Sequence, residues 1–430
     1  MFRFIYAVFL FLSLPDIAWT EIILCFKLLW SSFMLTDTVE NQKYIASLIS
    51  QLGIIPIKLG QWMGYFLKIQ YEHIPSMSLF LSSLEHLQNS CTYQKPVELE
   101  KHFQRFQDII YEYEPKPISS ASIAQIYRGK TVDGRVLAIK IRHDKIEESI
   151  DRWETIIQFI LKYFGVSINF EQFFLNVRQQ IDFEHEAENL KHFSRLYRKN
   201  RLIRIPEYIG GDEHILIMEY VPSDNFQTVV CDMDKEEREY FTTLSRILYE
   251  DTIFMKDVIH MDLHNGNWGV DRAKKQIVLY DFGWIMKDQS EFKRFFILVH
   301  LGRYNAMQFF LEKYNIYDKN EEVKNFVNDI CNDRTIDTLY GIRLVLKMFP
   351  EEFMMDNFMF CVLSLCVFIS SLSDKMDTID TYMEQQIHFM EANDIFLPLC
   401  TLIKNLQVPE TKEKIEIWCN DIKNSPSMIK

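Results

Sequence analysis

The spacing of apolar residues divides the chain into segments with different secondary structure. Between residues 40 and 115, apolar positions recur every three or four residues, the period of a helix that buries one face. The residues that show this spacing are Ile45, Leu48, Ile49, Leu52, Leu79, Leu84 and Leu87. Pro75 and Pro96 interrupt the pattern, so we predict a unit of several helices over 40–115.

The pattern changes to that of a β-hairpin between residues 118 and 141. Two strand-like runs flank the pair Asp133-Gly134, a sequence typical of a tight turn. A helical stretch is predicted next, from Ser149 to about Arg198, and strand-like runs follow at 203–209 and 215–221.

After Pro222 the pattern is mostly helical, apart from residues 260–283. This order predicts an α+β fold with a helical extension, a small β-containing lobe and a large helical lobe. The predicted units are an apolar N-terminal segment (1–39), the helical extension (40–115), the small lobe (116–222) and the helical lobe (223–430).

Three apolar runs raise the question of a membrane. The runs at 4–14 and 22–30 are both shorter than the roughly 18 residues that span a bilayer. We interpret this region as a helix lying in a membrane interface or as a buried packing helix, with a signal peptide as the alternative. A transit peptide is disfavoured because Asp16 and Glu21 are acidic. The run 358–372 is predicted to be a buried core helix.

Composition narrows the class of protein. The hydrophobic fraction of 48% is too high for a disordered chain, and the net charge of −13 argues against nucleic acid as the main partner. The eight cysteines form no Cys-x-x-Cys pair, which indicates neither a zinc site nor a disulfide framework and favours a reducing compartment, so we expect an intracellular protein.

Two short motifs carry the chemistry. Residues 260–267 read His-Met-Asp-Leu-His-Asn-Gly-Asn, and Asp281-Phe-Gly follows after a predicted hairpin. Asp262 is placed to orient a nucleophile, while the amide of Asn267 and the carboxylate of Asp281 suit a divalent cation. Together these motifs predict phosphoryl transfer.

Two residues upstream complete a phosphate site. Lys140 ends the second strand of the predicted hairpin, where it can hold phosphate oxygens. Glu186 lies in a helical stretch and is the candidate carboxylate that would fix the lysine. The Gly-rich loop of ordinary kinases is absent from the sequence, and 117–125 reads Pro-Ile-Ser-Ser-Ala-Ser-Ile-Ala-Gln instead.

These motifs, taken in order, resemble the UbiB family of atypical kinases, also called aarF-domain kinases. The most discriminating are Lys58-Leu-Gly60-Gln61 and the small-residue loop at 119–122. The others are Ala138-Ile-Lys140, the Asp182 to Ala187 segment, the 260–267 loop and Asp281-Phe-Gly. The resemblance covers roughly residues 40–285.

The resemblance implies a protein-kinase-like, two-lobed fold whose N-terminal helical extension covers the site. It also implies binding of ATP or ADP with Mg²⁺, and phosphotransfer or ATPase activity linked to isoprenoid or quinone-precursor lipids at a membrane surface. The implied roles are Lys58 and Gln61 over the site, Ala121 and Ser122 in the nucleotide loop, Lys140 with Glu186 as ion pair, Glu219 at the adenine hinge, Asp262 as catalytic carboxylate, and Asn267 with Asp281 as metal ligands.

The sequence departs from the family pattern at two places. Gln180 stands where the family has a glutamate, so a charged partner for Lys58 is lost. Ser119 and Ser120 replace alanine or glycine and add hydroxyls near the nucleotide loop.

Two other functions fit part of the pattern. The 260–267 loop also resembles that of small-molecule phosphotransferases acting on aminoglycosides or choline, from which the Lys58 motif is not expected. A second alternative is a pseudokinase that binds nucleotide and acts as a scaffold, and the departure at Gln180 is consistent with it. Protein kinase activity is disfavoured because no Ala-Pro-Glu motif follows Gly283.

Overall fold

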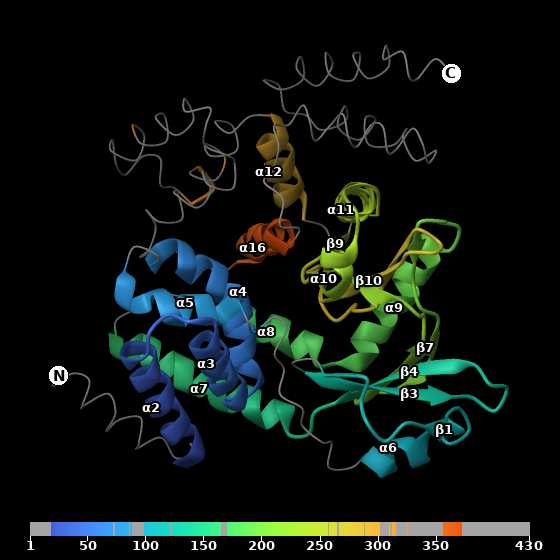
Figure 1. The fold of residues 1–430 in the computed structure, drawn as a ribbon, viewed down its shortest axis with the longest axis horizontal. Coiled ribbons are helices and arrows are strands. Elements are labelled where there is room, and N and C mark those ends of the chain that lie inside the picture. Colours follow the sequence, from blue (N-terminus) through green and yellow to red (C-terminus); the bar gives the residue numbers. More distant parts are fainter. Residues whose placement is uncertain are drawn as a thin grey trace.

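A computed structural model describes the central part of the chain. The described residues are 19–71, 74–85, 87, 99–120, 123–164, 170–256, 258–264, 266–287, 289–301, 309, 312–314, 325 and 356–371. Figure 1 shows a β-containing lobe beside a largely helical lobe, with the N-terminal helices packed along one side. The α+β, two-lobed architecture expected from the sequence is confirmed.

The small lobe is built on one antiparallel sheet whose strands differ in length. Its strands are β1 (Glu112–Tyr113), β2 (Ser119–Ser120), β3 (Ala124–Lys130), β4 (Val136–Arg142), β6 (Tyr208–Gly211) and β7 (Ile215–Glu219). The predicted hairpin is β3–β4, with Lys130 opposite Val136 and Gly134 at φ 85°, a left-handed conformation that glycine adopts freely. β1 falls inside the segment predicted to be helical, and there the prediction was wrong because a two-residue strand leaves no periodicity to detect.

Strand β4 separates two cores. Leu137, Ile139 and Ile141 belong to the smaller hydrophobic cluster, while Ala138 belongs to the main one. Because side chains alternate along a strand, Lys140 lies on the same face as Ala138 and so lines the cavity between the lobes.

The stretch predicted as helical from Ser149 to Arg198 forms three helices. They are α7 (Ile146–Phe164), α8 (Glu171–Gln180) and α9 (Phe183–Tyr197). α9 starts at Asp182, whose carboxylate accepts hydrogen bonds from the backbone N–H groups of Glu184 and His185. This cap explains the break between α8 and α9.

The N-terminal extension consists of helices, of which α4 packs against α7. They are α2 (Trp19–Met34), α3 (Val39–Gln51), α4 (Ile54–Tyr71), the 3₁₀ turn η1 (Pro75–Met77), α5 (Ser78–Glu85) and α6 (Leu99–Arg105). The indole N–H of Trp153 donates to the carbonyl of Leu52, 3.2 Å away, and ties α7 to the extension. The break predicted at Pro75 is confirmed, because η1 begins there after the end of α4. Pro96 lies outside the described residues.

Helix α2 has two apolar faces. Leu24 and Leu28 pack against the cluster formed by α3 and α5, whereas Ile23, Trp30 and Met34 are 50%, 68% and 61% exposed. The run 4–14 lies outside the described residues. In the part of the chain that the structure describes, every helix is too short or too polar to cross a membrane.

The helical lobe holds two small sheets and several helices. Its elements are β8 (Asp224–Asn225), α10 (Phe226–Val229), η3 (Val230–Asp232), α11 (Lys235–Glu250), the π-helical turn η4 (Asp251–Met255), β9 (Val258–His260), β10 (Trp268–Asp271), β11 (Gln276–Leu279), β12 (Ile285–Lys287), α12 (Ser290–Leu301) and α16 (Asn357–Ser371). The short strand β5 (Ile203–Arg204) pairs with β11, which joins the two lobes.

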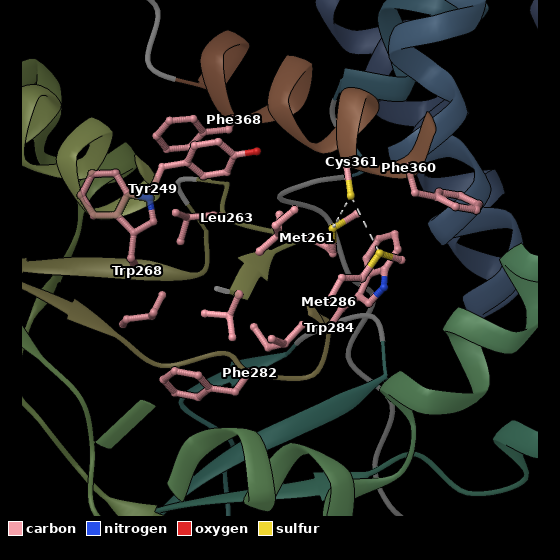
Figure 2. Packing of buried hydrophobic residues seen from close by; sticks show 14 of the residues in the cluster. Tyr249, Met261, Leu263, Trp268, Phe282, Trp284, Met286, Phe360, Cys361 and Phe368 are labelled. Carbon is pink, nitrogen blue, oxygen red and sulfur yellow. Dashed lines mark hydrogen bonds between the residues drawn. The ribbon is translucent and has the colours of Figure 1, made fainter. Parts of the chain in front are cut away.

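Helix α16 lies behind the 260–267 loop and supports it. Figure 2 shows the thiol of Cys361 facing the sulfurs of Met261 and Met286, at 3.8 and 3.9 Å. The hydroxyl of Ser364 donates to the carbonyl of His260, 3.4 Å away. The prediction of a buried helix here is confirmed, since residues 358–365 are all buried.

Candidate functional site

A cavity of about 750 Å³ lies between the lobes and under the extension. Its walls come from the extension, the small-lobe sheet, the segment that follows β7, and the two motif loops. The polar and charged residues that line it are Lys58, Gln61, Ser119, Ser120, Lys140, Gln180, Glu219, Ser223, Asn225, Thr228, Asp262, His264, Asn267 and Asp281.

Lys140 lies between two carboxylates. Its Nζ is 2.7 and 2.9 Å from the carboxylate oxygens of Glu186 and 3.2 Å from Oδ2 of Asp281. Lys140 is 2% exposed and Glu186 is fully buried. Burial alone lowers the pKa of Lys140, but Asp281 and Glu186 raise that pKa above its ordinary value, so the lysine is charged.

The two carboxylates differ in their surroundings. Burial raises the pKa of Glu186, against the attraction of Lys140, and we take Glu186 as ionised because it receives two short contacts from the ammonium group. For Asp281, burial raises the pKa, but two neighbouring groups lower it by more. These are Lys140 and the backbone N–H of Gly283, 3.0 Å from Oδ1, and the resulting pKa lies well below the usual range. The pair predicted between Lys140 and Glu186 is present.

His260 joins the two motif loops. One ring nitrogen, Nε2, is 2.8 Å from the carbonyl of Asp281, and the other accepts the backbone N–H of Asp262 at 3.3 Å. The proton therefore resides on Nε2, and burial lowers the pKa of His260, which keeps the ring neutral. β9 and β12 pair with His260 opposite Ile285, so the two loops are held at a fixed separation.

Asp262 is enclosed by two basic groups. Oδ2 is 3.4 Å from Nζ of Lys58, and Oδ1 is 3.6 Å from Nε2 of His264. Burial raises the pKa of Asp262, but Lys58 and His264 lower it more, so the pKa lies below its ordinary value. Lys58 is 5% exposed and comes from α4, which places the extension directly over this carboxylate.

His264 was not singled out from the sequence. The backbone N–H of Gly266 donates to Nδ1 of His264 at 2.9 Å, so the ring proton lies on Nε2 and faces Asp262. A Cβ at Gly266 would come within 2.7 Å of this ring, which explains the glycine. The place of His264 within the 260–267 motif was the signal that could have identified it from the sequence.

Asn267 and Asp281 are the residues that could hold a divalent cation. The amide nitrogen of Asn267 donates to the carbonyl of Asp262 at 2.7 Å, so the amide oxygen is the atom that could bind a metal. Among the described residues no group of three or more His, Cys, Asp or Glu side chains is arranged to hold a metal. A carboxylate and an amide oxygen nevertheless suit Mg²⁺, which takes its other ligands from phosphates and water.

The other residues predicted for the nucleotide site are only partly placed at the cavity. The side chain of Glu219 bonds to Arg204 at 2.5 Å, so only its backbone can contact a base at the hinge. Gln61 lines the cavity but its amide donates to the carbonyl of Leu87, 3.1 Å away, within the extension. Ala121 and Ser122 lie outside the described residues, while their neighbours Ser119 and Ser120 line the cavity.

Aromatic packing connects α9 to both loops. The ring of Phe193 lies 5.2 Å from that of Phe282 and 6.5 Å from that of His260. The amide of Asn189 donates to the carbonyl of Phe282 at 3.0 Å. A shift of α9 would therefore move Glu186 and the Asp281 loop together.

Comparison with known proteins agrees with this geometry. The model of the ABC1 atypical kinase-like domain matches residues 85–306. The chain belongs to the ABC1 atypical kinase-like family. The resemblance to UbiB proteins is thereby confirmed, and so is the kinase-like fold.

Several curated relatives of this ABC1-family chain carry kinase names. AarF domain-containing protein kinase 1 of Xenopus tropicalis is 28% identical over 249 residues, 53% of this chain and 46% of the relative. AarF domain-containing kinase 1 of Drosophila melanogaster is 25% identical over 194 residues, 41% of this chain and 37% of the relative.

A plant relative and a solved structure extend the comparison. Protein ACTIVITY OF BC1 COMPLEX KINASE 7 of Arabidopsis thaliana, named as chloroplastic, is 26% identical over 264 residues, 57% of this chain and 36% of the relative. The chain thus spans half or less of the length of these relatives. A Mycobacterium tuberculosis protein solved with erythromycin is 16% identical, with a TM-score of 0.47, over 81% of this chain and 92% of that one.

Proposed function

We propose that this ABC1-family protein binds ATP or ADP with Mg²⁺ and carries out phosphotransfer or ATP hydrolysis. The observation that carries the proposal is the convergence of Lys140, Glu186 and Asp281 with Asp262 around one cavity. A lysine held by two carboxylates is a preorganised cation for phosphate oxygens, and phosphoryl transfer relies on such positioning and charge.

Each residue has a defined task in this proposal. Lys140 binds phosphate oxygens, and Glu186 keeps its ammonium group in place. Asp262 orients the acceptor hydroxyl or water and takes its proton. Asn267 and Asp281 would hold Mg²⁺, which would supply positive charge to neutralise the phosphates.

Lys58 limits when Asp262 can act. Its ammonium group is 3.4 Å from Oδ2, where an acceptor hydroxyl would have to approach. A carboxylate paired with a lysine is also a weaker base than a free one. The extension must therefore release Asp262 before transfer to a bulky acceptor, which favours water or a small or flexible acceptor over a folded protein.

The lipid and membrane part of the proposal rests on α2. Its outer face exposes Ile23, Trp30 and Met34, and tryptophan is common where proteins meet the lipid interface. We propose that the protein acts at a membrane surface on, or in response to, isoprenoid or quinone-precursor lipids.

Turnover measurements test the enzymatic proposal. We expect wild-type protein to hydrolyse ATP in the presence of Mg²⁺, faster with liposomes carrying an isoprenoid-phenol analogue, and Asp262→Asn to lose at least 100-fold of this rate. A rate that Asp262→Asn leaves unchanged would exclude the proposed role of this carboxylate. Lipid-independent turnover would exclude only the lipid part.

A nucleotide-binding scaffold is the second candidate function. The contact between Lys58 and Asp262 favours it, because a permanently occupied catalytic carboxylate would permit binding without turnover. Nucleotide binding that equals wild type in Asp262→Asn, with no ATP hydrolysis by either protein, is the result expected of a scaffold.

A further inference from the structure

One side chain in the cavity has an unmet hydrogen-bonding need. Gln180, the last residue of α8, is 3% exposed and lines the cavity. Its Nε2 atom is buried and has no hydrogen-bond partner among the described residues. Leaving a buried amide N–H unpaired is unfavourable, and such groups in folded proteins call for a specific explanation.

The position of Gln180 places it at the metal end of the site. A Cβ added at Gly283 would lie 3.7 Å from the backbone carbonyl oxygen of Gln180, 3.5 Å from Oδ1 of Asp281 and 3.6 Å from Oε2 of Glu186. The backbone of Gln180 is therefore close to the groups proposed to hold Mg²⁺ and to fix Lys140.

The backbone around Gln180 is held in place. The guanidinium of Arg142 donates to the carbonyl of Ile181 at 3.0 Å, and the N–H of Ile181 caps α8 by donating to Val177. The buried Nε2 atom has no partner in the described part of the chain, so a ligand in the cavity that Gln180 lines is the group that can satisfy it.

The cavity that Gln180 lines also holds two lysines that can bind an anionic ligand. Lys58 and Lys140 line the same cavity as Gln180, together with the carboxylates of Asp262 and Asp281. An amide N–H that lines a cavity with two lysines suits a phosphate oxygen. A carboxylate at this position would instead repel phosphate.

We propose that the amide of Gln180 donates a hydrogen bond to the terminal phosphate of a bound nucleoside triphosphate. This inference rests on the proposed nucleotide binding and deepens it, because it makes Gln180 the residue that distinguishes ATP from ADP.

Two variants separate this role from a structural one. Gln180→Met has a similar volume and removes only the hydrogen-bonding group, so the melting temperature without ligand is expected to stay within 2 °C or to rise. Gln180→Glu places a negative charge at the same point. Gln179→Met is the matched control, because Gln179 is the exposed neighbour on the same helix.

The test is the dissociation constant of each protein for Mg-ATP and Mg-ADP by titration calorimetry. Gln180→Met is expected to weaken ATP binding by about 10-fold or more while ADP binding changes less than twofold, since a hydrogen bond to a charged group is lost only with ATP. Gln180→Glu is expected to weaken ATP binding further, and Gln179→Met to match wild type.

Three results would overturn the inference. Equal weakening of ATP and ADP by Gln180→Met would place the amide elsewhere on the nucleotide or make it structural. Unchanged ATP binding would show that it makes no contact with the terminal phosphate. Failure of wild-type protein to bind either nucleotide would overturn the proposed function and this inference together, whereas the first two results leave nucleotide binding standing.

Discussion

Two buried lysines line the same cavity, and their surroundings differ. Lys140 belongs to the small-lobe sheet and meets two carboxylates, Glu186 and Asp281. Lys58 belongs to the extension and meets one, the carboxylate of Asp262 at 3.4 Å. The first lysine is part of a buried charge network, while the second contacts the carboxylate that we propose acts in catalysis. The same residue type thus builds the site in one region and restrains it in the other.

Replacing Lys140 should have the largest effect. Lys140→Met leaves Glu186 buried without its cation, which typically costs about 3–5 kcal/mol of folding stability, and nucleotide binding should be lost as well. Chemical denaturation and nucleotide titration measure the two effects. Lys130→Met is the control, because that lysine pairs with Glu112 on the exposed part of the same sheet and should matter little. Equal stability of Lys140→Met and Lys130→Met would contradict the claim that Lys140 is part of a buried charge network.

Replacing Lys58 should act on rate more than on stability. Lys58→Met frees Oδ2 of Asp262 while His264 still contacts Oδ1. We expect nucleotide turnover to rise about 3- to 30-fold, because the carboxylate becomes a stronger and more accessible base. A fall in steady-state rate, with the fold intact by circular dichroism, would mean that Lys58 assists transfer rather than restrains it.

Gly266→Ala should show a smaller effect confined to the catalytic loop. The new methyl group would come within 2.7 Å of the His264 ring and force it away from Asp262, with a stability cost of about 1–3 kcal/mol. We expect turnover to fall about 10-fold with little change in nucleotide affinity. Gly134→Asn is the control, since Gly134 lies in an exposed turn with no atom within 4 Å of an added Cβ.

Membrane binding separates α2 from the rest of the surface. Trp30→Glu should reduce flotation with liposomes by at least half, because it puts a charge in the exposed apolar face of α2. Val132→Glu is the control, since Val132 is 75% exposed in the β3–β4 turn, far along the chain from α2. An equal reduction in both variants would mean that flotation does not depend on the α2 face.

The pH dependence of stability should show the smallest effect. Asp281 has a pKa in the folded protein below its value in the unfolded chain, so its charge stabilises the fold above about pH 4 and that contribution is lost as the pH falls below it. The difference in melting temperature between wild type and Asp281→Asn should be constant from pH 5 to 7 and shrink below pH 4. A constant difference down to pH 2 would contradict the assignment.

Local patterns predicted much of this molecule. Asp133-Gly134 located the β3–β4 turn, and the apolar run 358–372 located α16. The position of Lys140 in the second strand of the hairpin made it the candidate phosphate-binding lysine, and the structure pairs it with Glu186. These features depend on residues close in the chain, so periodicity and turn chemistry were sufficient.

Features that depend on distant residues were predicted only where the family resemblance supplied them. The resemblance placed Lys58 over the site, but no spacing rule identified its contact with Asp262, 204 positions away. The breaks between α7, α8 and α9 lie in a stretch of nearly continuous helical pattern, and only the Asp182 cap marks one of them. The unpaired amide of Gln180 is a property of three-dimensional packing, which is why the sequence marked only a departure there.

The central claim is that the network of Lys140, Glu186 and Asp281 binds a nucleotide together with Mg²⁺. Its most direct test is titration of the full chain with ATP, with and without Mg²⁺, for wild type and Asp281→Asn. We predict binding by wild type that strengthens at least 10-fold with Mg²⁺, and loss of this Mg²⁺ effect in Asp281→Asn. Binding that is independent of Mg²⁺, or a Mg²⁺ effect that Asp281→Asn leaves unchanged, would contradict the account.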